Sequence, residues 1–175
     1  MSEIRETENV DKQIENTEKK GAEGKEHFKS TYELKPNEKY EVNQYRYETD
    51  RNGRIKSAEG CLRLEKGKTN ADHQRKAGGE DRLEGDDGGH LIARRFGGSE
   101  KVDNIVPMDS HLNRGDYKNM ENRWAKAVER GDTVDVKVNC KYEGDSQRPS
   151  SISVYYKITD ANGNVVEQDK RRFRN

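Results

Sequence analysis

The segment that decides the fold is GDDGGHLIARRFGG, residues 85–98. It places two glycines, Gly88 and Gly89, directly before His90. Glycine has no Cβ, so another backbone or a ligand can approach closely at such a pair. A Gly-Gly-His sequence alone is weak evidence, because most single histidines are solvated or have a structural role. The residues that follow decide whether His90 belongs to a site.

Polar residues follow His90 at spaced intervals. They are Asn104, then Asn113 nine residues on, then Glu121 eight residues further. Taken singly, the two asparagines are typical of turns and the glutamate of an exposed helix surface. Together with His90, and in this order, they combine a residue suited to general-base catalysis with two amides and a carboxylate. A histidine suits the base role because its ordinary pKa near 6.5 leaves it largely neutral at physiological pH.

These motifs resemble the DNA/RNA non-specific endonucleases of the ββα-metal (His-Me finger) class. That class has an Asp-Arg-Gly-His segment, an Asn-Ile/Leu-x-Pro segment, an Asn-x-Gly turn and a helix with a glutamate. Residues 86–93 and 142–150 also look like segments of the C-terminal nuclease domains of type VII-secreted, LXG-like bacterial toxins. The resemblance covers about residues 32 to 175.

The resemblance implies a role for each spaced residue. His90 becomes the general base, and Asn104 orients either the histidine or the phosphate. Asn113 becomes the ligand of a Mg²⁺ ion, with Mn²⁺ as an alternative, since such ions prefer oxygen ligands and keep several waters. Glu121, about two helical turns beyond Asn113, binds the metal through a water or orients its neighbours. Asp87 is expected to accept a hydrogen bond from a ligand rather than bind the metal.

One position departs from the class. The class has an arginine where this chain has Gly88. The positive charge on the scissile phosphate must then come from another residue, and we include Arg82 among the catalytic candidates, with Arg94 and Arg75 as alternatives. Contacts to the nucleic acid are expected from Arg94, Arg95 and Arg114, although each arginine could also be an ordinary solvated side chain.

The flanking sequence predicts strands, turns and one main helix. Asn52-Gly53 and Asn162-Gly163 each favour a hairpin turn. Hydrophobic residues alternate along residues 134–142, as in a strand with one buried face. A helix is expected from about residue 116 to 130, with Met120, Trp124 and Val128 facing the core and Gly131 ending it. Residues 66–90 are interpreted as a long ordered loop.

The predicted fold is therefore α+β, a ββα-metal finger core with an antiparallel sheet, flanking hairpins and one main helix. Residues 1–30 are expected to form a charged tail or linker, helical or disordered, and residues 31–175 the nuclease domain. The run 170–174 is expected to be either a solvated edge strand or a contact to a phosphate backbone.

Composition limits the other possibilities. Hydrophobic residues make up 28% and charged residues 39% of the chain, so the core is expected to be thin. The 34 basic and 34 acidic residues balance, so any attraction for nucleic acid must come from a local patch. No run of about 18 apolar residues is present, which predicts no membrane insertion. Cys61 and Cys140 lack CxxC spacing and are expected to be small buried hydrophobes.

By resemblance, the function is that of a metal-dependent endonuclease with little sequence preference, with DNA the favoured substrate. The expected biological role is an antibacterial toxin exported by a type VII route. It would be held inactive in the producer cytoplasm by an immunity protein and act in the cytoplasm of a target cell. The alternative is a catalytically silent module of the same fold that binds nucleic acid or an inhibitor. A third option, a β-rich interaction domain, leaves the glycine-rich segment unexplained.

Overall fold

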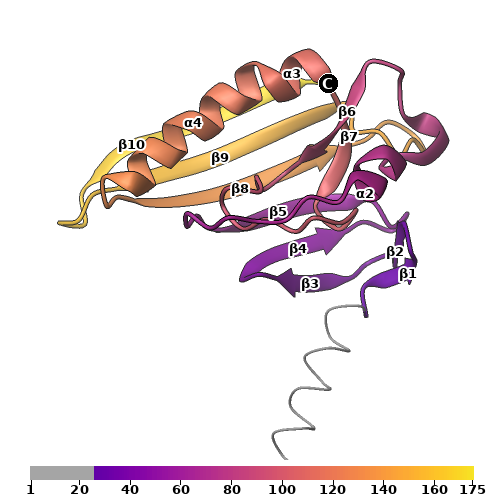
Figure 1. Cartoon of the computed structure of the whole chain (residues 1–175), viewed down its shortest axis with the longest axis horizontal. Helices are drawn as coiled ribbons and strands as arrows, with labels where there is room; N and C mark the ends of the chain where they lie inside the picture. The colour runs from indigo at the N-terminus through magenta and orange to yellow at the C-terminus, as the bar shows by residue number, and fades with distance from the viewer. Residues whose placement is uncertain (1–25) are drawn as a thin grey trace, which may run out of the picture.

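The computed structural model describes residues 26–175. A long antiparallel sheet dominates it, with helices on one face (Figure 1). The strand order is β10-β9-β8-β5-β4-β3. These strands are β3 (Lys39–Val42), β4 (Tyr45–Thr49), β5 (Ile55–Cys61), β8 (Thr133–Lys141), β9 (Ser151–Thr159) and β10 (Val165–Arg174).

The remaining elements form a short N-terminal hairpin and an insertion between β5 and β8. The hairpin pairs β1 (Phe28–Ser30) with β2 (Glu33–Leu34). The insertion contains α2 (Ala71–Lys76), the 3-10 turn η1 (Gly79–Asp81), β6 (Asp86–His90), β7 (Ile105–Asp109), α3 (Ser110–Arg114) and α4 (Asp116–Glu129). The fold is α+β, as the sequence predicts.

Both predicted hairpins are confirmed, and the same interactions build each turn. Asp50 accepts hydrogen bonds through its side chain from the backbone N–H groups of residues 52 and 54, and Gly53 has a φ of 73°. Asp160 does the same for residues 162 and 164, and Gly163 has a φ of 84°. An aspartate that bonds to the backbone two residues on therefore fixes each turn, and glycine supplies the left-handed conformation.

The helix α4 packs on the sheet as its periodicity predicts. Met120 and Trp124 are fully buried, and Val128 packs partly buried at the rim of the core. The helix ends at Glu129, one residue before the expected end, and Gly131 follows with a φ of 92°. The predicted strand is also confirmed: β8 covers residues 133–141, and its alternate residues are buried beneath α4.

The prediction of a long loop at residues 66–90 is wrong. The segment contains α2, η1 and the strand β6. Asn70 caps α2 by accepting a hydrogen bond from the backbone N–H of His73, a local signal for a helix start. The run of glycines hid β6, because glycine is rare in strands unless another backbone lies close by. At Gly88 an added Cβ would lie 2.4 Å from the carbonyl oxygen of Gln74 in α2, so glycine is required there.

The two cysteines differ in their exposure. Cys140 is buried as expected, but Cys61 is exposed at the end of β5, where its strand position turns it to the open face of the sheet. Both are free thiols.

Most of the predicted tail lies outside the described residues, but His27 is buried and hydrogen-bonds to Asp103 at 2.9 Å. Among the residues described, no helix has the length and apolar character needed to span a membrane.

Candidate active site

An antiparallel ribbon followed by a helix carries the candidate residues. Strand β6 pairs with β7 so that Asp87 lies opposite Met108 and His90 opposite Ile105. Helices α3 and α4 follow β7 directly, which gives the order β, β, α. Asp109 begins α3 by accepting hydrogen bonds from the backbone N–H groups of residues 111 and 112. This capped turn fixes the position of Asn113 relative to the ribbon.

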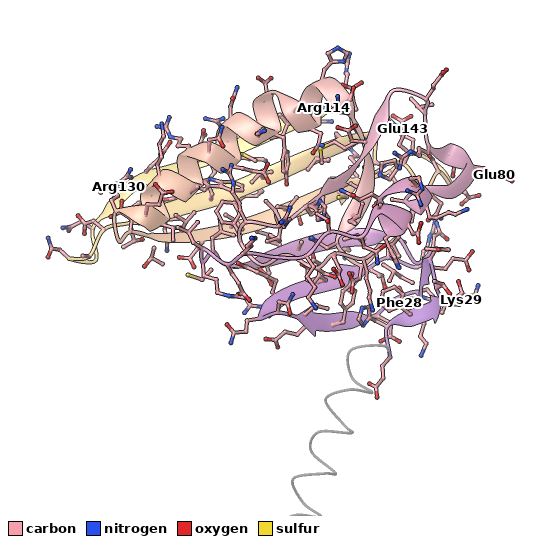
Figure 2. All side chains as sticks on the ribbon, in the orientation of Figure 1. Phe28, Lys29, Glu80, Arg114, Arg130 and Glu143 are labelled. Atoms are coloured by element: carbon pink, nitrogen blue, oxygen red, sulfur yellow. The ribbon has the colours of Figure 1, made fainter. Side chains whose placement is uncertain are left out.

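Asp87 joins β6 to α3 through three hydrogen bonds. Asn113 donates from Nδ2 at 3.0 Å, and Arg114 donates from Nε and Nη2 at 2.8 and 2.6 Å. Arg114 lies at the end of α3 that faces the ribbon (Figure 2). Burial raises the pKa of Asp87, but the bonds from Arg114 and Asn113 outweigh it, so this pKa lies below the ordinary aspartate value. Asp87 is therefore an anion that fixes the amide of Asn113.

The orientation of Asn113 leaves its oxygen available. Its Nδ2 is used by Asp87, and no hydrogen bond between described residues uses its Oδ1. An amide oxygen in this position can bind a cation. The described residues hold no group of three or more His, Cys, Asp or Glu side chains that could bind a metal by themselves. Any divalent ion at Asn113 would therefore complete its coordination with water and substrate oxygens.

His90 is the last residue of β6 and is largely buried. Burial first, and the positive charge of Arg94 second, lower the pKa of His90 to about 4. Its Nε2 atom is buried and lacks a hydrogen-bond partner among the described residues. The imidazole is therefore neutral at physiological pH, which is the form that can accept a proton.

Glu121 lies on the inner face of α4 and is 8% exposed. Burial raises its pKa to about 7, while the positive charges of Arg95 and Lys118 oppose that rise. The ion pairs formed between described residues do not include Glu121. A buried carboxyl group without an ion-pair partner is costly to ionise and favours a nearby cation.

Asn104 is fully buried, and its side chain holds the backbone that follows His90. It accepts from the backbone N–H of Ile92 at 3.0 Å and donates to the carbonyl oxygens of Ile92 and Ser99 at 2.8 and 2.9 Å. Its own carbonyl accepts from the N–H of Leu91 at 2.9 Å. These partners are all backbone groups, so Asn104 reaches His90 only through the chain.

The candidate arginines differ in their hydrogen-bond and ion-pair partners. Arg82 donates to the backbone carbonyls of Gln74 and Asp86, so it joins α2 to β6. Arg94 donates to the carbonyl of Gly67 at 2.8 Å, and Arg95 donates to Asn122 at 2.6 Å. The alternative Arg75 pairs with Asp72 on the exposed side of α2. Of these side chains, Arg94 and Arg95 are the ones whose charges act on His90 and Glu121, respectively.

Sequence reasoning missed a second anchor of the ribbon. Arg148 donates from Nε and Nη2 to Asp86 at 2.7 and 2.9 Å, and from Nη1 to the carbonyl of Asn175 at 2.9 Å. The side chain of Asn175 in turn bonds to the backbone of residues 107, 109 and 149. The adjacent pair Asp86-Asp87 was the available signal, because neighbouring residues of a strand point to opposite faces and need separate partners.

An antiparallel β-ribbon followed by a helix, with a histidine on the strand and an asparagine held by an aspartate, defines the nuclease class with a ββα core. Residues 36–160 match the DNA/RNA non-specific endonuclease family, and the chain belongs to this family.

The matching relatives include two EssD proteins. The chain is 45% identical over 119 residues to the type VII secretion system protein EssD of Staphylococcus aureus strain USA300, and likewise to EssD of strain NCTC 8325. The match covers 64% of this chain but 19% of each relative, so the chain corresponds to about a fifth of their length.

Two solved nucleases are similar to this chain, and the first of them shares its fold. A structure of Sda1 nuclease with a bound zinc ion has a TM-score of 0.50 and 15% identity, covering 74% of this chain and 75% of that one. A structure titled extracellular nuclease has a TM-score of 0.47 and 20% identity, covering 73% of this chain and 75% of that one.

Proposed function

We propose that this domain is a divalent-metal-dependent endonuclease that hydrolyses phosphodiester bonds of nucleic acid, DNA above all, with little sequence preference. The observation that carries the proposal is the bond from Asn113 Nδ2 to Asp87, which leaves the Asn113 amide oxygen available beside a strand that ends in a neutral His90. Membership of the endonuclease family supports the same reaction.

In this proposal His90 is the general base. Its Nε2 is buried, so Nδ1 is the ring nitrogen that takes the proton from the attacking water. The low pKa keeps the ring unprotonated before the reaction, and the nearby charge of Arg94 favours the return of that proton to solvent or the leaving group. Asn104 contributes indirectly, because it fixes the backbone immediately after His90.

Asn113 and Glu121 would hold the divalent cation, Asn113 directly and Glu121 directly or through water. Mg²⁺ or Mn²⁺, when bound, supplies Lewis-acid stabilisation of the charge that develops on the phosphate. The bound zinc named for Sda1 nuclease supports a divalent cation in this fold. Asp87 keeps the Asn113 oxygen turned outward, and Glu121, with a pKa near 7, becomes ionised when a cation approaches.

In this proposal arginines contact the phosphates, and no group recognises particular bases. Arg94, Arg95 and Arg114 are the proposed contacts, and contacts to phosphates position a protein without reading sequence. Arg82 remains the catalytic arginine candidate from the sequence, but its bonds to Gln74 and Asp86 support a role in holding the ribbon against α2.

The relatives support a proposal for the biological role. EssD is a type VII secretion system protein, which supports export of this nuclease by that route. We propose that it acts as an antibacterial toxin, held inactive by an immunity protein in the producer cytoplasm and active in the cytoplasm of the target cell. Residues 31–175 are proposed as the nuclease domain of such a toxin.

The test is cleavage of plasmid DNA by the purified chain. The wild-type chain should nick and degrade plasmid with Mg²⁺ or Mn²⁺ and lose this activity in EDTA. His90→Ala should lower the rate by about 10² to 10⁴-fold, the usual contribution of a general base. The matched control is His111→Ala, which removes a side chain that is 98% exposed and keeps the backbone N–H that caps α3. Wild-type cleavage by His90→Ala would overturn the base assignment. Tight DNA binding without product by the wild-type chain would favour the silent binding module.

A further inference from the structure

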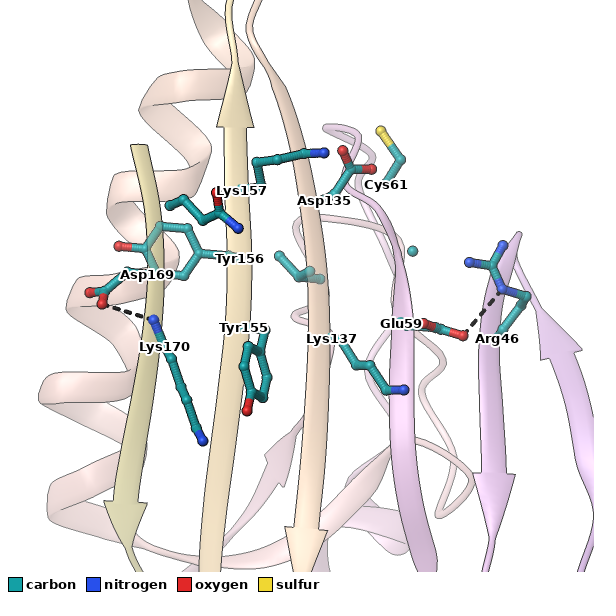
Figure 3. A pocket seen from close by; sticks show the side chains of 13 residues that line it. Arg46, Glu59, Cys61, Asp135, Lys137, Tyr155, Tyr156, Lys157, Asp169 and Lys170 are labelled. Carbon is teal, nitrogen blue, oxygen red and sulfur yellow. Dashed lines mark hydrogen bonds and ion pairs between the residues drawn. The ribbon is translucent and has the colours of Figure 1, made fainter. Parts of the chain in front are cut away.

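One face of the large sheet is open to solvent in the described structure. Helix α4 covers the opposite face (Figure 1). The register of β8, β9 and β10 identifies the side chains on the open face, because Lys137 lies opposite Tyr155 and Tyr155 opposite Lys170. Figure 3 shows these three side chains, with Lys157, projecting from neighbouring strands over a hollow of about 710 Å³.

This open face of β8 to β10 is strongly basic. We define the basic face as Lys137, Lys141, Lys157, Lys170, Arg172 and Arg174. Asp135 is the acidic residue at the same strand positions of β8 to β10. On the neighbouring strand β5, Glu59 lies opposite Lys137, and Glu59 and Asp169 also line the hollow. Glu167 and Asp169 have the opposite register and bond to Arg123, Tyr156 and Arg171 instead. A concentration of positive charge on a chain whose net charge is zero attracts partners of opposite charge to this face.

The basic face also carries an exposed aromatic ring. Tyr155 is 44% exposed, and the ammonium group of Lys170 lies 5.0 Å from its ring centroid. Surfaces that bind single-stranded nucleic acid combine cations that follow the backbone with aromatic rings on which bases stack. Tyr155, with lysines on either side of it along the sheet, has this arrangement.

The basic face leads to the candidate active site. Its row of Lys141, Ser151 and Arg174 lies at the end of the sheet next to Asn175. The Asn175 side chain accepts a hydrogen bond from the backbone N–H of Asp109 at 2.8 Å, and Asp109 begins the helix that carries Asn113. A nucleic-acid strand that leaves the candidate active site can therefore continue over this edge of the sheet onto the basic face.

We propose that the basic face is a second nucleic-acid-binding site, which holds a single-stranded segment of substrate away from the scissile bond. The chemistry recognised is the phosphate backbone, with Tyr155 available for stacking. The inference depends on the proposed function only in taking the ligand to be nucleic acid.

The test compares two triple variants that change the same charge. The first is Lys137→Glu/Lys157→Glu/Lys170→Glu, and the control is Lys29→Glu/Lys35→Glu/Lys126→Glu, which changes exposed lysines on β1, after β2 and on α4. Binding of a labelled single-stranded DNA of about 40 nucleotides is measured by anisotropy in EDTA across a salt series. Circular dichroism confirms that both variants fold, and Lys→Gln at the same three positions gives a milder version.

The first variant should bind about tenfold more weakly, with the slope of log K against log salt reduced by about 2, because each phosphate contact contributes about 0.7 for single strands. The control should match the wild type. Wild-type affinity and slope in the first variant would overturn the proposal. Unchanged DNA affinity with lost affinity for polyglutamate would also overturn it, in favour of an acidic protein partner.

Hydrolysis of bis(p-nitrophenyl) phosphate separates this proposal from the nuclease function. That substrate is too small to reach from the site to the basic face, so its rate should be unchanged in the first variant while KM for long single-stranded DNA rises. If the wild-type chain hydrolyses neither substrate, the nuclease proposal fails. Weaker DNA binding by the first variant in EDTA would still support the second site.

Discussion

Asp86 and Asp87 are neighbours in sequence but bind different partners. Adjacent strand residues point to opposite sides, so Asp86 meets Arg148 and Asp87 meets Asn113 and Arg114. The two carboxylates therefore fix β6 to different parts of the molecule, Asp86 to the loop after β8 and Asp87 to α3. The orientation of the Asn113 amide depends on Asp87 in particular.

Replacing Asp87 with Asn should lower metal affinity by about 10 to 100-fold, the usual effect of losing a group that orients a ligand. The reason is that Asn113 would lose the anion that holds its Nδ2. Titration calorimetry with Mn²⁺ measures the change. Arg114→Ala is the control, because it leaves the bond between Asp87 and Asn113 in place. Equal Mn²⁺ affinity in Asp87→Asn and the wild type would refute this role.

The sequence proposes His90, Asn104, Asn113 and Glu121 as site residues because their order resembles the family pattern. It could not show that the side chain of Asn104 bonds only to backbone groups, or that Arg82 bonds to Gln74 and Asp86, because these contacts follow from how the segment folds and not from a residue pattern. Nor could it find Arg148, which lies 62 residues from Asp86.

At the scale of elements, local patterns predicted β8, α4 and both hairpins, since each has a regular hydrophobic period or a turn signal. Strand β6 was not predicted, because glycines 88 and 89 give no side-chain period. Their absence of Cβ atoms lets α2 lie against Gly88 and Met108 against Gly89. The family has an arginine at this position, and the close packing of α2 against Gly88 explains why this chain has a glycine instead.

Gly88→Ala should destabilise the fold by about 1 to 3 kcal/mol, the usual cost of overpacking. Its Cβ would lie 2.4 Å from the Gln74 carbonyl oxygen and 2.6 Å from the Gln74 Cα, so α2 must move. Gly85→Ala is the matched control, because nothing lies within 4 Å of its added Cβ. Urea denaturation measures both. Equal denaturation midpoints for Gly88→Ala and Gly85→Ala would show that α2 can move without lowering the free energy of unfolding.

At the scale of the molecule, Arg148 and Asn175 join the ribbon to the large sheet. The Asp86 carboxylate is 1% exposed and the Arg148 side chain 12% exposed, so their pair is nearly buried. Burial raises the pKa of Asp86, but the hydrogen bonds from Arg148 and Leu83 outweigh it, and the pKa lies below the ordinary aspartate value. The ionised pair therefore contributes its full stabilisation at pH values above the ordinary aspartate pKa. This contribution is lost as the pH falls through the lowered pKa of Asp86 in the folded protein.

Asp86→Asn should lower the free energy of unfolding at pH 7 by about 3 kcal/mol, because Arg148 keeps a nearly buried charge without its partner. The difference from the wild type should shrink as pH falls below the ordinary aspartate pKa, and it should vanish below the lowered pKa of Asp86, where the wild-type carboxylate is also neutral. Urea unfolding across a pH series measures it. A difference that stays constant down to the acid limit would contradict the pKa shift.

We propose above all that Asn113, held by Asp87, binds a divalent cation within reach of His90. The most direct measurement is a crystal structure with Mn²⁺ and an anomalous difference map. We expect a peak bonded to the Asn113 amide oxygen, on the side of the ribbon that carries the His90 imidazole, and we expect this peak to be lost in Asn113→Ala. A peak bonded elsewhere, or one that survives Asn113→Ala, would contradict it.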